Sequence, residues 1–161
     1  KRQPALRSVL PAGGRVRHLP TLPELTGLHV SGECVMGTTV RGPLALYRYA
    51  PLQGAVLTGQ VIPFAAQWPE HLKLLIYRYS PVPALAPATL PEPLLHRFGT
   101  RARDVGGLRS WDQLTYQGWP VYVCLLDRPG TRPAGIIESQ FEQLRVEVLP
   151  LGGQGCAGQG P

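Results

Sequence analysis

The chain has few charged residues and lacks a hydrophobic run long enough to cross a membrane. Only 16% of its 161 residues are charged. Pro or Arg interrupts every hydrophobic run before it reaches the roughly 18 to 20 residues that a membrane-spanning helix needs. The sequence therefore predicts no membrane-spanning helix.

The sequence also lacks the common motifs of enzyme active sites. It has no Gly-x-Ser-x-Gly, no His-Glu-x-x-His and no glycine-rich loop for phosphate. Aspartate occurs only at positions 104, 112 and 127, and Asp127 opens an Asp-Arg-Pro-Gly sequence that is typical of a turn. We expect a protein that is not an enzyme, unless a bound metal supplies the chemistry.

Asparagine is absent, whereas the chain has 19 Gly and 18 Pro. So many residues that break regular structure leave little room for long helices and favour short strands joined by turns. We therefore predict an all-β fold, an antiparallel sandwich or barrel-like structure with few or no helices.

The strongest local signal is the stretch from Leu114 to Gly130. Two short apolar runs flank Gln117-Gly118, which predicts a β-hairpin. The run from Val121 to Leu126 is apolar at every position except Tyr122, so both faces of that strand should be buried inside a sheet.

A short tyrosine motif occurs twice, as LYRYAP and as IYRYSP. In a strand, the two tyrosines of each copy point to one face, and Arg48 or Arg78 points to the other. The tyrosines can form core and cross-strand pairs, or an exposed adhesive surface for protein or glycan. The candidate interaction residues are Tyr47, Arg48, Tyr49, Tyr77, Arg78 and Tyr79.

Proline spacing divides the chain into five parts. Residues 1–27 read as a Pro/Arg-rich arm, and the prolines of residues 81–93 predict a stiff, polyproline-like connector. We expect β lobes at residues 28–80 and 94–150 and a flexible tail at 151–161. The two lobes can still share a core.

The net charge of +6 is carried almost wholly by arginine. The arginines are scattered and do not follow an aromatic platform, so we predict no nucleic-acid partner. Arginine also binds carboxylates and anionic lipid headgroups. The expected partners are a larger protein and, peripherally, a membrane surface.

Three cysteines stand far apart, at positions 34, 124 and 156. Cys34 and Cys124 form either a disulfide, which would stabilise by roughly 4 to 5 kcal/mol in the chain-entropy model, or two buried free thiols. Cys156, in the Gly-rich tail, is expected to be unpaired or bonded outside the domain.

The histidines show no spacing typical of a metal site, but they could converge in the fold. Imidazole together with the sulfur atoms of Cys34 and Met36 would suit copper. The alternative function is therefore a copper-binding protein, including a copper-only superoxide dismutase, although its expected His-x-His pair is missing. The candidate metal ligands are His29, His71 and His96.

The hairpin LTYQGWPVYVCLLDRPG resembles the T-Y-N-G-x-P-L-Y-x-F-x-x-D-x-x-P-G segment of the secreted-repeat lipoproteins of bacterial envelopes. Leu46-Tyr47-Arg48-Tyr49 is similar to the G-x-x-L-Y-x-F segment of that family, and Trp68-Pro69 to its Trp-Pro pair. The matching positions of the hairpin are Thr115, Tyr116, Gly118, Pro120, Tyr122, Asp127, Pro129 and Gly130. The resemblance spans residues 38–135.

This resemblance implies an exported all-β protein of the periplasm, outer membrane or cell surface, with no settled enzymatic activity. The chain opens at Lys1 without an initiator Met, as expected for a mature product after removal of a signal segment. We therefore expect an accessory or structural subunit that binds a larger protein of the cell envelope or surface layer.

Overall fold

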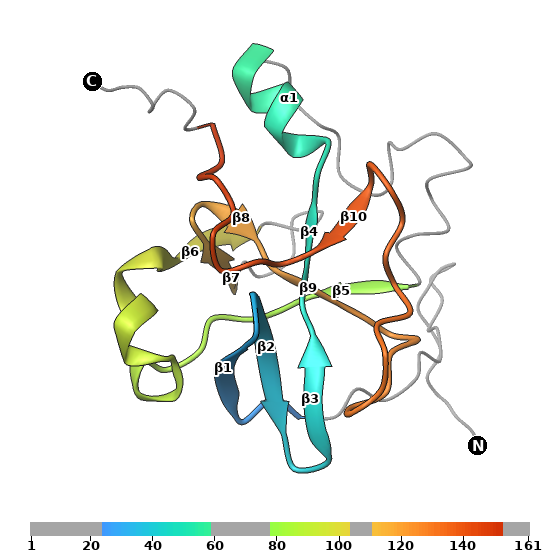
Figure 1. The fold of residues 1–161 in the computed structure, drawn as a ribbon. Coiled ribbons are helices and arrows are strands. Elements are labelled where there is room, and N and C mark those ends of the chain that lie inside the picture. Colours follow the sequence, from blue (N-terminus) through green and yellow to red (C-terminus); the bar gives the residue numbers. More distant parts are fainter. Residues whose placement is uncertain (1–23, 59–77, 104–110, 153–161) are drawn as a thin grey trace, which may run out of the picture.

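The computed structural model describes residues 24–58, 78–103 and 111–152. Their strands form three antiparallel sheets, with the orders β1-β2-β3, β10-β4-β9-β5 and β6-β7-β8 (Figure 1). The predicted all-β class is confirmed. No helix among these residues is long and apolar enough to span a membrane.

The first sheet is a meander of β1 (Gly27–Ser31), β2 (Cys34–Thr39) and β3 (Gly42–Ala45). Tight turns connect its strands, and the turn glycines Gly32 and Gly42 have φ values of 60° and 131°, where side chains other than hydrogen are disfavoured. Burial alternates along β2, so one of its faces packs inward. The sequence predicts strands at residues 28–30 and 34–40 with a turn at Ser31-Gly32, and this prediction is confirmed.

The four-stranded sheet combines distant parts of the chain. It contains β4 (Tyr47–Tyr49), β5 (Tyr79–Pro81), β9 (Tyr122–Cys124) and β10 (Phe141–Gln143). Strand β9 lies between β4 and β5, so the interior position expected for the Val121–Leu126 run is confirmed for Tyr122–Cys124, whereas Leu126 lies in the following turn and is 57% exposed. The two stretches expected as separate lobes thus contribute strands to one sheet.

The third sheet contains the predicted hairpin, with β6 (Phe98–Arg103), β7 (Trp111–Tyr116) and β8 (Trp119–Pro120). Gln117 and Gly118 have φ values of 52° and 81°, the positive pair of a type I′ turn. The hairpin is shorter than expected because the chain leaves this sheet after Pro120 and enters the four-stranded one as β9. Between them, the Val121 N–H donates to the Leu114 carbonyl at 3.0 Å, which joins the two sheets.

Two regions differ from the predicted backbone. The sequence from Ala55 to Phe64 predicts a strand or hairpin, with Gly59 at a bulge or turn, but residues 55–58 end a short helix, α1 (Leu52–Thr58). The proline-rich connector folds into two 3₁₀ helices, η3 (Pro87–Thr89) and η4 (Glu92–Arg97), and is not a continuous polyproline rod. Each begins with Pro at its first or second position, where the missing N–H costs no helical hydrogen bond.

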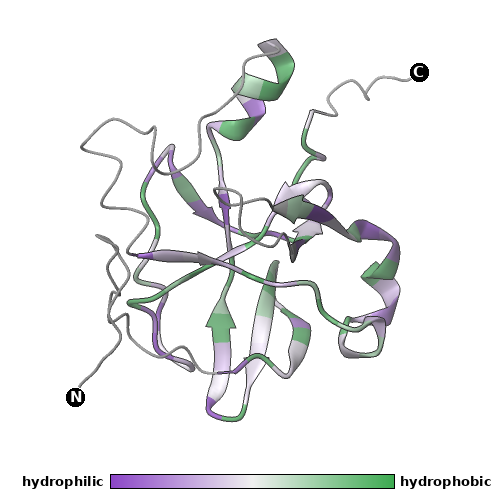
Figure 2. Cartoon of the chain, turned by 180° about the vertical axis from the view of Figure 1, so that it is seen from behind, coloured by the Kyte–Doolittle hydropathy of each residue, from purple (hydrophilic) through white to green (hydrophobic). Residues whose placement is uncertain are grey.

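The core has an aliphatic part and an aromatic part. The aliphatic part joins all three sheets through buried side chains that include Leu28, Leu46, Leu114 and Val123. The aromatic part lies against the four-stranded sheet and contains Ala45, Tyr47, Tyr49, Tyr79, Cys124 and Phe141. Hydrophobic residues (green) also occur on α1, which projects from the body (Figure 2).

The alternation of Leu144, Val146 and Val148 with Gln143, Arg145 and Glu147 predicts a strand with one solvent-exposed face. In the structure, residues 144–148 keep this alternation, with Leu144 buried and Arg145 and Glu147 exposed. They do not form a full strand. A single bridge pairs Arg145 with Cys34, and the Val146 N–H donates to the Glu33 carbonyl at 2.9 Å. This segment therefore runs beside the β1–β2 turn and forms one wall of the site described next.

Candidate functional site

The two faces of the four-stranded sheet carry different side chains. Register places Tyr47 opposite Tyr122 and Tyr79 opposite Cys124 on one face, whereas Arg48 stands opposite Glu142 on the other. Because side chains alternate along a strand, one face is aromatic and the other carries the charged pair.

The aromatic face is buried, which corrects the idea of an adhesive tyrosine surface. Tyr47, Tyr49 and Tyr79 expose no more than 9% of their surface. The Tyr79 and Phe141 rings stack with centroids 3.7 Å apart, and Tyr47 meets Tyr79 edge-on at 5.8 Å. These tyrosines are core and cross-strand residues. Tyr77 lies outside the described residues.

A buried polar network satisfies the tyrosine hydroxyls. Tyr47 Oη donates to Asp127 Oδ2 at 2.6 Å and accepts from the Gly135 N–H at 3.0 Å. Ala134 N–H donates to Asp127 Oδ1 at 2.5 Å, and Tyr79 Oη donates to the Gly135 carbonyl. Burial raises the pKa of Tyr47 and of Tyr79. The network ties the loop after β9 to the sheet.

Of the two alternatives for Cys34 and Cys124, a disulfide or two buried free thiols, the structure has free thiols, with Cys124 buried and Cys34 half-buried. Cys34 begins β2 in the first sheet, whereas Cys124 lies in the aromatic core of the second. A Cβ atom at Gly135 would come within 2.8 Å of the Cys124 sulfur, so this loop packs directly on the thiol. Burial raises the pKa of Cys124 and keeps the thiol protonated.

The described histidines lie on separate elements. His29, on β1, shares a hydrogen bond of 2.6 Å between Nδ1 and Thr38 Oγ1, and His96 belongs to η4. Within residues 24–58, 78–103 and 111–152, no three His, Cys, Asp or Glu side chains form a group that could hold a metal ion. His71 lies outside this part of the chain.

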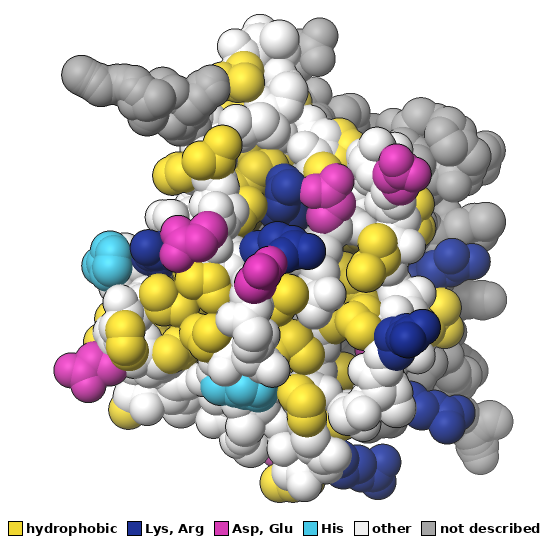
Figure 3. Space-filling model, in the orientation of Figure 1, with side chains coloured by type: hydrophobic (Ala, Val, Ile, Leu, Met, Phe, Trp, Pro, Cys, Tyr) yellow, Lys and Arg dark blue, Asp and Glu magenta, His cyan; other side chains and the backbone are white. Residues whose placement is uncertain are grey.

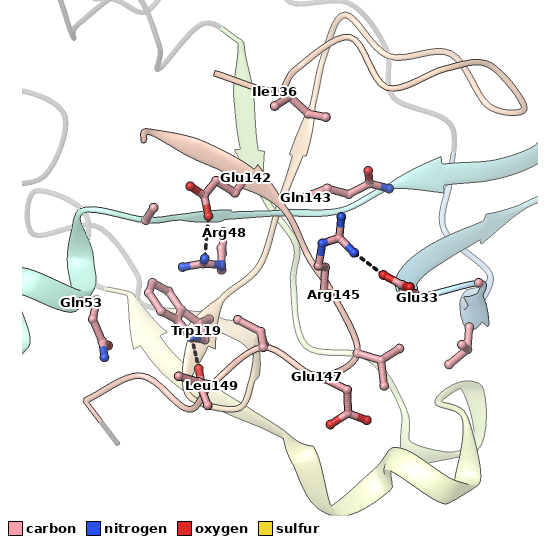
Figure 4. Close-up of a pocket in the computed structure, with 15 residues that line it drawn as sticks. Glu33, Arg48, Gln53, Trp119, Ile136, Glu142, Gln143, Arg145, Glu147 and Leu149 are labelled. Carbon is pink, nitrogen blue, oxygen red and sulfur yellow. Dashed lines mark hydrogen bonds and ion pairs between the residues drawn. The ribbon is translucent and has the colours of Figure 1, made fainter. Parts of the chain in front are cut away.

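The charged face of the sheet opens into a cleft of about 980 Å³, which we call the Arg48 cleft. At its floor the Arg48 guanidinium lies over the Trp119 ring, 4.4 Å from the centroid, and Arg48 Nη2 binds Glu142 Oε1 at 2.6 Å (Figure 4). The Trp119 indole N–H donates to the Leu149 carbonyl at 2.7 Å. Arg48 is thus fixed from two sides by a cation–π contact and an ion pair.

The walls of the Arg48 cleft alternate charged and apolar side chains. Arg145 binds Glu33 at 2.5 Å across the β1–β2 turn (Figure 4). Between the charges, Ile136 and Leu149 are 54% and 69% exposed at the rim. Both arginines bind carboxylates, so the cleft offers paired charged groups around apolar surface.

A second arginine fixes the wall formed by residues 146–149. Arg97 Nη1 and Tyr116 Oη both donate to the Val146 carbonyl, at 2.8 and 2.6 Å. The hydrogen bond that Arg97 Nη1 donates to Tyr116 Oη, at 3.3 Å, is the main cause of a raised pKa for Arg97. Three of the elements that build the cleft, β4, β8 and this wall, are therefore held in place before any ligand binds.

Sequence reasoning found Arg48 but missed its surroundings. Trp119, Glu142, Arg145 and Glu33 come from three distant stretches of the chain, and no sequence motif joins them to Arg48. The register of β4 against β10 places Glu142 opposite Arg48, and this register cannot be read from the sequence. Comparison with family models, curated proteins and solved structures finds no match to this chain.

Proposed function

We propose that this protein is a binding module, an exported accessory subunit that holds an extended segment of a larger bacterial envelope or surface-layer protein in the Arg48 cleft. The envelope setting rests on the resemblance of the hairpin to the secreted-repeat lipoproteins. The cleft supports the binding role, and the observation that carries it is the Arg48–Trp119 unit at the floor between exposed apolar side chains.

Tryptophan and arginine are enriched among the residues that dominate protein interfaces. A rigid aromatic ring and a fixed guanidinium lose little conformational freedom on binding, so more of the contact energy remains as affinity. Ile136 and Leu149 stand exposed at the rim, where they can bury apolar surface against a partner side chain. The backbone of such a partner would lie between the two arginine–glutamate pairs.

The test uses exposed positions, so that the fold is kept. Ile136→Glu and Leu149→Glu place an unpaired charge in the cleft, and each is expected to weaken binding of the envelope partner at least about tenfold. The matched control is Leu126→Glu in the turn after β9, a leucine that is 57% exposed and does not line the cleft. The partner is first identified by photo-crosslinking from position 136, and affinities are then measured with the purified pair.

Two results would contradict the proposal. Equal weakening by Leu126→Glu would mean that a new charge anywhere on the surface weakens binding and that the cleft is not the binding site. Near-stoichiometric copper in protein purified from its native envelope, by elemental analysis, would favour the copper-binding alternative and direct attention to His29, His71 and His96.

A further inference from the structure

A second surface lies where three distant turns meet. The Gly130 N–H donates to the Pro43 carbonyl at 2.7 Å, so the turn after β9 packs against the β2–β3 turn. The Leu125 N–H donates to the Arg78 carbonyl at 2.6 Å, so the residue before β5 lies beside the start of the turn after β9. Gly42 permits this approach, because a Cβ there would come within 3.3 Å of the Gly130 Cα.

Four arginines project from these segments: Arg41, Arg78, Arg128 and Arg132. All four are exposed, and within the described part of the chain none of them forms an ion pair, in contrast to Arg48, Arg97 and Arg145. The one carboxylate in the same turn, that of Asp127, faces inward to Tyr47. Among the described residues, no carboxylate therefore pairs with these four positive charges. We call this surface the arginine corner.

Exposed apolar residues stand among these charges. Val40, at the tip of the β2–β3 turn, is 91% exposed, and Leu126 is 57% exposed. Figure 3 shows basic side chains toward the lower right of the molecule, with hydrophobic side chains between them. The arginine corner thus combines positive charge with apolar side chains that no described residue covers.

We propose that the arginine corner binds an anionic membrane surface. Guanidinium groups form paired hydrogen bonds with phosphate oxygens, and each basic residue near an anionic bilayer adds to the attraction. Val40 and Leu126 would enter the boundary between headgroups and acyl chains, where apolar side chains gain free energy by leaving water. Charge alone would also suit a soluble polyanion, but the turn tip at Val40 favours the bilayer.

This inference goes beyond the proposed function, because the arginine corner and the Arg48 cleft share no residue. A chain held to the membrane by one surface would present the other to its protein partner. Failure of one proposal therefore leaves the other standing.

The test measures co-sedimentation of the full chain with phosphatidylcholine vesicles, with and without phosphatidylglycerol. Binding is expected only to the vesicles that contain phosphatidylglycerol and is expected to weaken with salt. Arg128→Gln should lower the partition coefficient about fivefold, and Arg41→Gln with Arg128→Gln about 25-fold. Val40→Ser should lower it several-fold with no change in charge.

The matched control is Arg101→Gln on β6, an exposed arginine that removes the same charge elsewhere. It should change the partition coefficient less than Arg128→Gln does. Equal losses for the two variants would overturn the proposal, as would an absence of binding to anionic vesicles. Binding of a single-stranded oligonucleotide that depends on Arg41 and Arg128 but not on Val40, without vesicle binding, would replace the membrane with nucleic acid.

Discussion

The two faces of the four-stranded sheet show how one short strand can serve two purposes. On one face, Tyr47 is fully buried and its hydroxyl is enclosed by Asp127 and Gly135. On the other, Arg48 lies on Trp119 at the floor of an open cleft. The aromatic face is tightly packed, so a substitution there disturbs the core. The Arg48 face is accessible to solvent, and its charged side chains form a pair in an open cleft. We therefore expect substitutions on the aromatic face to cost stability and substitutions on the Arg48 face to change binding.

Gly135→Ala should have the largest effect on stability. The new Cβ would come within 2.7 Å of the Cys124 Cβ and 3.0 Å of the Tyr47 ring, and these core atoms cannot move aside. Overpacking of this kind should lower the free energy of unfolding by about 3 kcal/mol, measured by urea denaturation.

The control for this substitution is Gly54→Ala on α1, where a Cβ would meet nothing within 4 Å. Alanine favours a helix over glycine, so this variant should be stabilised by about 0.5 to 1 kcal/mol. If Gly135→Ala were also neutral or stabilising, the loop would not pack tightly on the aromatic face.

Tyr47→Phe should have the next largest effect. It removes the hydroxyl and leaves Asp127 Oδ2 and the Gly135 N–H without that partner, at a cost of about 2 kcal/mol near neutral pH. Binding of the partner in the Arg48 cleft should be unchanged, since the ring lies on the opposite face.

The same residue gives the aromatic face a pH dependence. Burial raises the pKa of Tyr47 and Tyr79 above the ordinary 10.0, so the folded state keeps both protons while the unfolded state loses them. The contribution of the two tyrosines to the free energy of unfolding is therefore fully present below pH 10. Above pH 10 it falls by about 1.4 kcal/mol per pH unit for each tyrosine. In Tyr47→Phe the slope above pH 10 should be shallower by one tyrosine's contribution.

Glu142→Gln should have the smallest effect on stability. The Arg48–Glu142 pair is partly exposed, and such pairs contribute less than about 1 kcal/mol. A loss of more than about 2 kcal/mol on urea denaturation would mean that the Arg48 face is also structural, and the contrast between the two faces would fail.

The sequence by itself determined the class of fold and several local features. Gly and Pro favoured short strands, Gln117-Gly118 formed the hairpin turn, and the apolar run that starts at Val121 gave an interior strand at Tyr122–Cys124. These features depend on a few neighbouring residues, and backbone preferences act at that range. The alternation at residues 144–148 was readable for the same reason.

Only the tertiary structure decided which face of each strand is buried and which residues meet. The spacing of Tyr47 and Tyr49 is the same whether the tyrosine face is core or surface, and burial depends on the loop that carries Asp127 and Gly135. Likewise, Arg48 gains its role from Trp119 and Glu142, which lie 71 and 94 residues away. Such contacts follow from the order and register of the strands. Burial of apolar side chains over the whole chain selects this order and register, and no local sequence pattern encodes them.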